Sequence, residues 1–324
     1  MCFRLLFMCL LLASCSDARS DKNAGTIKET ERAEEDSTSL VVLGTIQDAG
    51  SPQAGCEKEY CRGLFDSPDP DRQVVSLGLY DATTGRRYLF EATPDMPRQM
   101  KALSRHGEKV GGEVADGIFL THAHTGHYTG LMYLGKEAMD AQNVPVYTMP
   151  KMSTFLSANG PWDQLVSRNN IVLNQMTEGQ GVRLSDGVTV TPYLVPHRDE
   201  YSETVGYRIQ GPAKSALFIP DIDKWEKWDK DILKEIKRVD YAFLDATFYS
   251  SRELNNRDMS EIPHPFILES LGKFASLSSE DRNKVIFIHF NHTNPVIDPE
   301  SEEARTVRQK GFNIATNGDA YSLQ

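Results

Sequence analysis

Three histidines lie close together in the segment THAHTGHYTG, which covers residues 121–130. His122, His124 and His127 follow directly after the apolar run GIFL. Imidazole nitrogens are preferred ligands of zinc and of other borderline divalent metals. The segment therefore predicts a metal site.

Further residues of metal-ligand type stand at the ends of later apolar runs. Asp221 follows SALFIP, His289 follows KVIFI, and His197 closes a predicted hairpin strand. Strand ends that meet at one edge of a sheet can bring residues from distant parts of the sequence into one pocket. A single histidine usually has an ordinary structural role, but six of the 8 histidines lie in or beside three such segments. This clustering favours metal binding.

Predicted strands and helices alternate along the rest of the chain. Strands are expected at residues 40–46, 74–80, 87–92, 117–121, 144–148, 203–209, 215–221, 240–248 and 284–290, with a hairpin over 181–197. Helices are expected at residues 94–106, 126–139, 225–239, 265–277 and 299–311. The alternation indicates an α/β (α+β) protein in which helices cover sheets.

The first fifteen residues, MCFRLLFMCLLLASC, differ from the rest of the chain. They carry one positive charge, Arg4, then an apolar core, then small residues before Cys15. The core is shorter than the ~20 apolar residues of a membrane-spanning helix and is typical of a signal peptide. LASC resembles the cleavage site of bacterial lipoproteins, where the cysteine becomes the lipid-modified N-terminus. We expect an exported, membrane-anchored lipoprotein, periplasmic or at the cell surface; the alternative is an ordinary secretory signal.

Residues 16–38 are predicted to be a flexible tether. Most of this stretch is polar and charged, with Ile27 the only large aliphatic residue between 16 and 37, so it cannot bury enough surface to offset its ordering entropy. One folded domain is expected over residues 39–324.

Two cysteines, Cys56 and Cys61, fall in this predicted domain, in the loop segment GCEKEYCR. In an oxidising compartment they could form a disulfide. They could also be half of a structural zinc site, which would need two ligands from elsewhere, or two free thiols. The spacing leaves these alternatives open.

Composition and charge limit the class of partner. The chain is 40% hydrophobic and 25% charged, which is typical of a globular protein. Its net charge of -11 argues against nucleic acid, because phosphate binding relies on Lys and Arg. We expect a small-molecule substrate, and a membrane contact only through lipid on Cys15.

The motifs resemble the metallo-β-lactamase fold superfamily. Its loop H-x-H-x-D-H matches HAHTGH except at Gly126, YTGL follows as in the family, and the later His197, Asp221 and His289 occur in the family's order. The resemblance covers roughly residues 40–324 and implies a four-layer αββα sandwich. VLGTIQDAGSPQAGC, LDATFY and VIFIHFNHTNP are most similar to the coenzyme PQQ synthesis protein B branch.

The resemblance implies up to two zinc or other divalent ions. The first would be held by His122, His124, His197 and Asp221. The second would share Asp221 with His127 and His289, lacks the carboxylate that Gly126 replaces, and has His292 as a possible substitute ligand. We therefore expect one tightly bound ion and a second that is weak or absent. Alternatively, Gly126 is needed for a positive φ in the turn.

The phosphodiesterase and tRNA-processing branches of the superfamily add a proton donor. They place a histidine shortly after a strand similar to DATF, and here His264 occupies that position. Asp245 could orient a ligand histidine.

The implied reaction is metal-assisted hydrolysis of an ester or phosphodiester, with Asp221 and His264 in catalytic roles. Two alternatives remain. The first is an oxidoreductase or biosynthetic accessory protein like coenzyme PQQ synthesis protein B, against which the export signal and the retained histidines argue. The second is a non-catalytic metal-binding protein, against which the number of apparent ligands argues.

Overall fold

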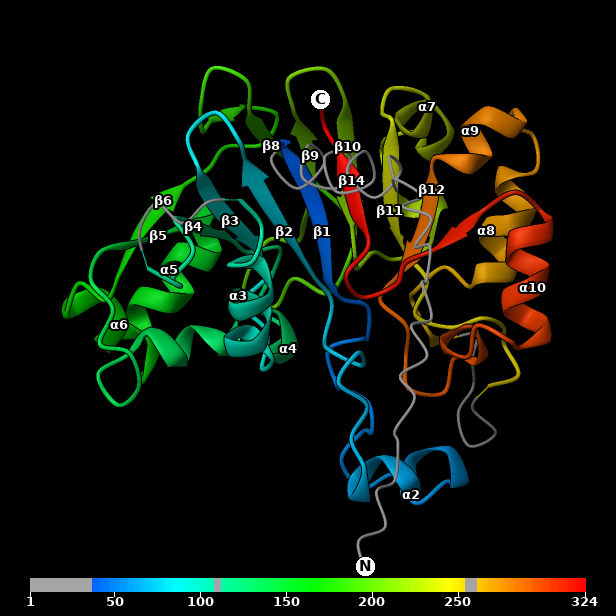
Figure 1. Ribbon diagram of the computed structural model, residues 1–324, viewed down its shortest axis with the longest axis horizontal. Coiled ribbons are helices and arrows are strands. Elements are labelled where there is room, and N and C mark those ends of the chain that lie inside the picture. Colours follow the sequence, from blue (N-terminus) through cyan, green and yellow to red (C-terminus); the bar gives the residue numbers. More distant parts are fainter. Residues whose placement is uncertain (1–36, 108–111, 254–260) are drawn as a thin grey trace, which may run out of the picture. The chain divides into compact units, whose positions relative to one another are not determined.

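The computed structural model describes residues 37–107, 112–253 and 261–324. The predicted signal peptide and nearly all of the predicted tether lie outside these residues. Asp36–Gln324 forms one compact unit. Its described residues form two seven-stranded sheets (Figure 1).

The first sheet contains the strands of the N-terminal half and one strand from the C-terminus. In spatial order these are β14 (Ala320–Ser322), β1 (Ser39–Gly44), β2 (Ser76–Asp81), β3 (Arg86–Phe90), β4 (Gly117–Phe119), β5 (Val144–Thr148) and β6 (Ile171–Gln175). Neighbours from β14 to β3 are antiparallel, and those from β3 to β6 are parallel. A tight turn over residues 82–85 joins β2 to β3 as a hairpin.

The second sheet repeats this plan. Its spatial order is β13 (Asn313–Ile314), β12 (Val285–Ile288), β11 (Tyr241–Asp245), β10 (Ser215–Ile219), β9 (Val205–Gln210), β8 (Thr189–Leu194) and β7 (Val182–Arg183). The strands from β7 to β10 are antiparallel, and those from β10 to β13 are parallel. Each sheet thus brings the carboxyl ends of several parallel strands to one edge, where loops that carry functional side chains can meet.

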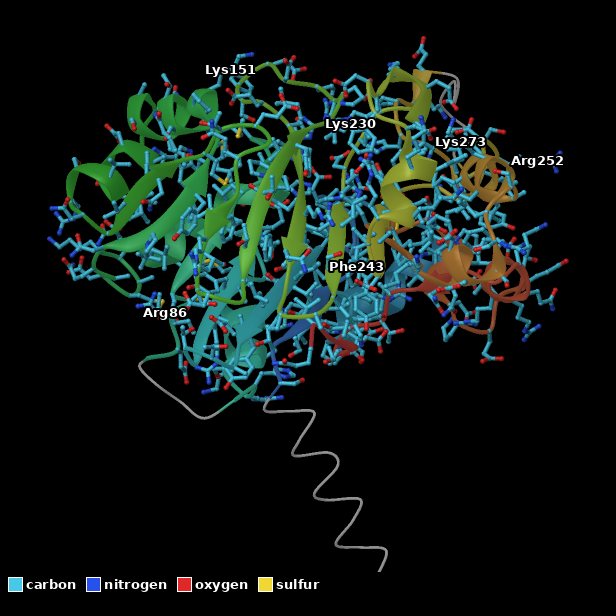
Figure 2. All side chains as sticks on the ribbon, turned by 90° about the horizontal axis from the view of Figure 1, so that it is seen from above. Arg86, Lys151, Lys230, Phe243, Arg252 and Lys273 are labelled. Carbon is cyan, nitrogen blue, oxygen red and sulfur yellow. A yellow bond between two sulfur atoms is a disulfide. The ribbon has the colours of Figure 1, made fainter. Side chains whose placement is uncertain are left out.

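Alternate residues of the strands face different apolar layers, as the two-residue period of a strand requires. Phe90 and Phe119 of the first sheet pack against Tyr207, Phe218 and Phe243 of the second. Phe243, labelled in Figure 2, lies in this layer between the sheets.

Helices cover the outer face of each sheet. Over the first sheet lie α3 (Met96–Leu103), α4 (Thr125–Tyr128), the 3-10 helix η1 (Thr129–Leu134), α5 (Pro150–Ala158) and α6 (Trp162–Ser167). Over the second lie η2 (Trp225–Lys227), α7 (Ile232–Lys237), α8 (Ile267–Phe274), η4 (Pro295–Ile297) and α10 (Glu302–Gln309). The protein is therefore the four-layer αββα sandwich that the resemblance implied. None of the helices in the described ranges is long and apolar enough to cross a bilayer.

Two predicted helices are wrong in detail. Residues 126–139 form only α4 and η1, because Gly130 lies directly against the backbone of residues 92–93 and its amide donates to Ala92 O. Residues 225–239 form η2 and α7, separated by a break that ends where the Asp231 side chain caps α7. The sequence interpretation also missed α2 (Glu59–Asp66), α5, α6, α9 (Ser279–Asn283) and β6.

Candidate metal centre

A first group of residues that can bind a metal lies at the carboxyl ends of β4, β8 and β10. His122 and His124 follow β4, His197 follows β8, and Asp221 follows β10. His122 Nε2 lies 2.7 Å from His124 Nδ1. Asp221 Oδ2 lies 3.4, 3.8 and 3.2 Å from the facing nitrogens of His122, His124 and His197. Ligands bonded to a tetrahedral zinc ion at ~2.0–2.1 Å are separated by about 3.3 Å, and the three distances from Asp221 lie near this value.

Neighbouring polar side chains orient the rings of this group. Thr121 Oγ1 lies 2.8 Å from His122 Nδ1, and the same hydroxyl donates to Glu91. His197 Nδ1 lies 3.1 Å from Asp223 Oδ1. Metal-bound histidines commonly use their second nitrogen in this way.

A second group lies beside the first. Asp48, His127 and His289 each offer a ligand atom, and the three atoms lie within 4.8 Å of one another. His127 Nε2 is also 3.9 Å from Asp221 Oδ2, so Asp221 lies between the two groups. His289 Nδ1 lies 2.9 Å from Thr247 Oγ1, which leaves its Nε2 for a ligand.

The unpaired atoms of the two groups fit a divalent metal. Among the described residues, none forms a hydrogen bond with the buried Nε2 atoms of His127, His197 and His289. Burial and the neighbouring histidines hold the pKa of His122 well below its usual value, although Asp221 opposes this shift. Burial likewise lowers the pKa of His124. A neutral imidazole has an unshared electron pair on one ring nitrogen, which it can donate to a cation.

Asp221 is ionised. Burial alone would raise its pKa, but His197 and His264 hold that pKa well below its usual value. Conversely, burial would lower the pKa of His197, whereas Asp221 and Asp223 raise it to about 9. A buried carboxylate surrounded by imidazoles is a suitable ligand for two ions at once.

His264 lies next to Asp221 although it is distant in sequence. Its Nδ1 is 3.2 Å from Asp221 Oδ1 and 2.9 Å from Asp245 Oδ2. Burial alone would lower the pKa of His264, but Asp245 and Asp221 raise it well above its usual value. His264 also lines a cavity of about 410 Å³ together with Arg198 and Thr247. A protonated histidine at this cavity can act as a general acid.

Asp245 holds this arrangement together. Its carboxylate is fully buried and accepts hydrogen bonds from the backbone of Ile222 and Thr247. The pKa of Asp245 is lowered to about 2, because His264 and His289 outweigh its burial. The sequence interpretation assigned Asp245 to a ligand histidine. The structure places its oxygens closer to His264, at 2.9 Å, than to His289, at 3.8 Å.

Three residues at this centre were missed from the sequence: Asp48, Glu91 and Asp223. Glu91 is fully buried, follows β3 directly, and lies 3.2 Å from His127 Nδ1. Its φ of 76° and the φ of 70° at His289 lie in the left-handed region, which is unusual for such residues and is found at functional sites. A carboxylate next to the end of a predicted strand was the available signal for Glu91.

Two sequence-based alternatives are wrong. Gly126 does not have the positive φ that was offered as a reason for glycine. His292 does not join the second group, where it was a possible substitute ligand. It lies instead with Cys56 and Cys61.

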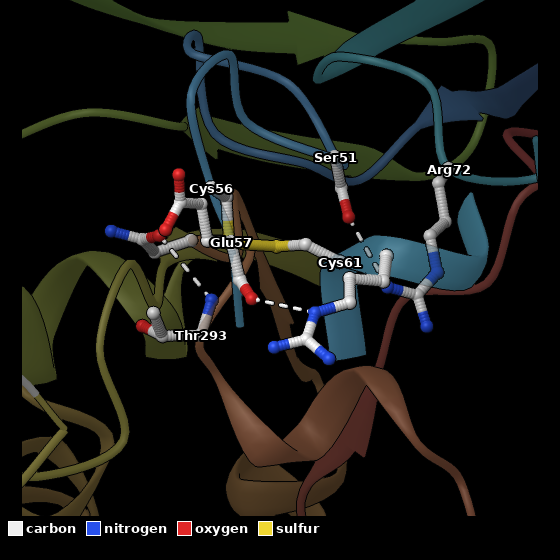
Figure 3. Close-up of a disulfide and its surroundings, with 8 residues drawn as sticks. Ser51, Cys56, Glu57, Cys61, Arg72 and Thr293 are labelled. Atoms are coloured by element: carbon white, nitrogen blue, oxygen red, sulfur yellow. Dashed lines mark hydrogen bonds between the residues drawn. A yellow bond between two sulfur atoms is a disulfide. The ribbon is translucent and has the colours of Figure 1, made fainter. Parts of the chain in front are cut away.

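Cys56 and Cys61 form a disulfide, one of the alternatives that the spacing left open (Figure 3). Cys61 lies in α2, and the Arg62 side chain donates to Glu57 O beside the bridge. A disulfide has no thiolate to offer a metal. The pair is therefore separate from the metal centre.

Residues 86–290 match the family model of the beta-lactamase superfamily domain. The chain belongs to this superfamily. Coenzyme PQQ synthesis protein B of Methylorubrum extorquens (strain PA1) is 24% identical over 309 residues, which cover 88% of this chain and 99% of that protein.

Solved structures agree on the fold. Zn²⁺-bound PqqB from Methylobacterium extorquens superposes with a TM-score of 0.72 at 21% identity, covering 88% of this chain and 100% of that one. A diphosphatase from the PhnP family superposes with a TM-score of 0.61 at 23% identity, covering 89% and 98%. At these identities the likeness shows the metallo-β-lactamase sandwich and leaves the reaction open.

Proposed function

We propose that this protein is a metal-dependent hydrolase of ester or phosphodiester substrates. The observation that carries the proposal is the position of His264, which contacts Asp221 of the metal centre and lines the 410 Å³ cavity. A proton donor beside a metal centre and facing a cavity is the arrangement that hydrolysis with a poor leaving group needs.

A bound divalent ion would supply a water of lowered pKa and would polarise the bond to be cleaved. His122, His124, His197 and Asp221 would hold it. Zinc suits these nitrogen and oxygen ligands, and the related PqqB was crystallised in a Zn²⁺-bound form.

His264 would protonate the leaving group. Its Nδ1 is engaged by Asp245 and Asp221, which leaves Nε2 as the nitrogen that donates. Asp245 keeps the ring protonated and oriented. Arg198 lies exposed at the cavity and offers a positive charge for an anionic substrate.

The test is hydrolysis of generic chromogenic substrates, a bis-aryl phosphodiester and an aryl ester or lactone. We expect the zinc-loaded protein to hydrolyse at least one of them, a chelator to abolish the activity, and zinc to restore it. Zinc-loaded protein that hydrolyses none of them would count against the proposal.

The second candidate is a role like that of coenzyme PQQ synthesis protein B, as an oxidoreductase or biosynthetic accessory protein. It is favoured by relatives of that name, which align with 88% of this chain. Metal binding without hydrolysis of either substrate class would favour this candidate.

We also propose that the protein is anchored to a membrane by lipid on Cys15. The proposal rests on LASC at residues 12–15 and on the preceding apolar segment. Cys15→Ser should move the protein from the membrane fraction to the soluble fraction after a carbonate wash. Cys15→Ser protein that stays in the membrane fraction would contradict it.

A further inference from the structure

The second group contains a carboxylate from a distant part of the chain. Asp48 stands 78 positions before Gly126 in the sequence, after the end of β1. A Cβ atom added to Gly126 would lie 2.3 Å from Asp48 Cβ, 2.4 Å from its Cα and 2.5 Å from its O. The position that a side chain at residue 126 would occupy is therefore filled by Asp48 itself.

Hydrogen bonds fix the backbone of Asp48 beside the end of β12. Gln47 N donates to Phe290 O at 2.8 Å, and Phe290 N donates to Thr45 O at 2.7 Å. Residues 45–47 thus pair in the parallel sense with Phe290, the residue that follows His289. Because both bonds are backbone bonds, the location of Asp48 next to His289 is a property of the fold and not of one flexible side chain.

Within the described ranges, the Asp48 carboxylate has no hydrogen-bond partner that would explain its position. It is half-buried, and none of the described residues donates a hydrogen bond to its side chain. Its oxygen lies within 4.8 Å of ligand nitrogens of His127 and His289. The Nε2 atoms of these two histidines are themselves buried and lack hydrogen-bond partners among the described residues.

We infer that Asp48 replaces the carboxylate missing at position 126 and, with His127, His289 and the shared Asp221, binds a second divalent ion. The inference rests on the metal centre of the proposed function and adds a ligand to it. The inference also explains why residue 126 is glycine. Gly126 leaves space for Asp48, so the carboxylate ligand comes from another segment. The second site thus has, in Asp48, a carboxylate that it does not share with the first site.

Calorimetric titration of Zn²⁺ into metal-free protein tests the inference. We expect two ions per chain for the native protein. Asp48→Asn has nearly the same shape but no charge, and it should weaken the second ion by at least about 100-fold, the upper range for losing a residue that only orients a ligand. The first ion should bind as before. The matched control is Asp66→Asn, which removes the same charge from an exposed position at the end of α2.

Thermal unfolding without metal shows whether Asp48→Asn folds as the native protein does, and Asp48→Ala provides a second variant. Equal stoichiometry and affinity in native protein and folded Asp48 variants would overturn the inference, as would a single ion in the native protein. Either result leaves hydrolysis by the first site possible. Failure of the proposed function is a different result, namely two bound ions without hydrolysis.

Discussion

The two groups of ligands lie side by side but are assembled in different ways. In the first group, His122 and His124 come from one short motif, and His197 and Asp221 stand at strand ends. In the second, His127 and His289 have these same two origins, but Asp48 comes from a loop held beside the end of β12 by backbone hydrogen bonds to Phe290. A ligand can therefore move to another segment if the fold brings that segment to the same place and the old position becomes glycine.

The largest expected effect follows from removing the residue that both groups share. Asp221→Ala should abolish binding of both ions, because Asp221 lies between the groups, 3.2 Å from His197 and 3.9 Å from His127. Losing the several kcal/mol that a metal contributes corresponds to roughly 10³–10⁴-fold in rate. Metal analysis and kcat for the chromogenic substrates measure the two losses. Two ions retained by folded Asp221→Ala protein would show that it is not the shared ligand.

The sequence predicted the first group better than the second for a physical reason. His122 and Asp221 follow apolar runs whose strand character is readable locally, and parallel strands carry their ends to one edge. Asp48 lies two residues beyond the predicted strand 40–46, but its position next to Gly126 depends on pairing between residues 45–47 and Phe290, which no local pattern shows. A missing ligand in a motif is therefore not evidence of a missing site until the fold is known.

The same difference between local sequence pattern and tertiary contact explains which parts of the fold were predicted. The long alternating and apolar segments that become β2, β3, β8, β10 and β12 are predicted correctly, and so is the four-layer class. Helices α2, α5 and α6 and strand β6 are missed; only part of each is buried, so the apolar pattern along them is weaker. The predicted helix over 126–139 is shortened by the close approach of Gly130 to the neighbouring backbone, which only tertiary packing reveals.

A smaller effect is expected for the proton donor, which belongs to neither group. His264→Ala should keep both ions and lose about 10²–10⁴-fold in kcat, the usual contribution of a general acid. The loss should shrink for substrates with good leaving groups, because these depart without a proton. Comparing p-nitrophenyl with unactivated alkyl esters of the same acid measures this dependence. An equal loss on both kinds of substrate would indicate a structural role for His264.

Mutating a residue that orients a ligand should weaken metal binding by one group and not by the other. Asp223 lies 3.1 Å from His197 Nδ1, so Asp223→Asn should lower zinc affinity of the first group by roughly 10–100-fold and leave the second unchanged. Competition with a chromophoric chelator measures both affinities. Lys227→Ala is the control, because it removes the 2.7 Å ion pair of Asp223 but keeps the carboxylate. Equal weakening of both groups by Asp223→Asn would mean that they do not bind independently.

The smallest change in rate is expected at Gly126, where no ligand is altered. Gly126→Ala places a methyl group 2.3–2.5 Å from Asp48, including its backbone, so residues 45–48 must shift. Overpacking of this kind costs about 1–3 kcal/mol of unfolding free energy, which denaturation of the metal-free protein measures. The second ion should weaken while the first is kept, and the rate at saturating zinc should fall less than about tenfold, since excess metal refills a weakened site.

Gly272→Ala is the matched control for this substitution. Gly272 lies in α8, and a Cβ added there would meet nothing within 4 Å, so alanine should leave stability equal or raise it by about 0.4–1 kcal/mol. Gly126→Asp separates the two explanations of the glycine. If Gly126 were only a lost ligand, this variant would gain metal while Gly126→Ala stayed unchanged. Because Asp48 fills the space, we expect both Gly126 variants to lose stability and second-site zinc, and a gain of tight metal by Gly126→Asp would show that Asp48 does not hold that position.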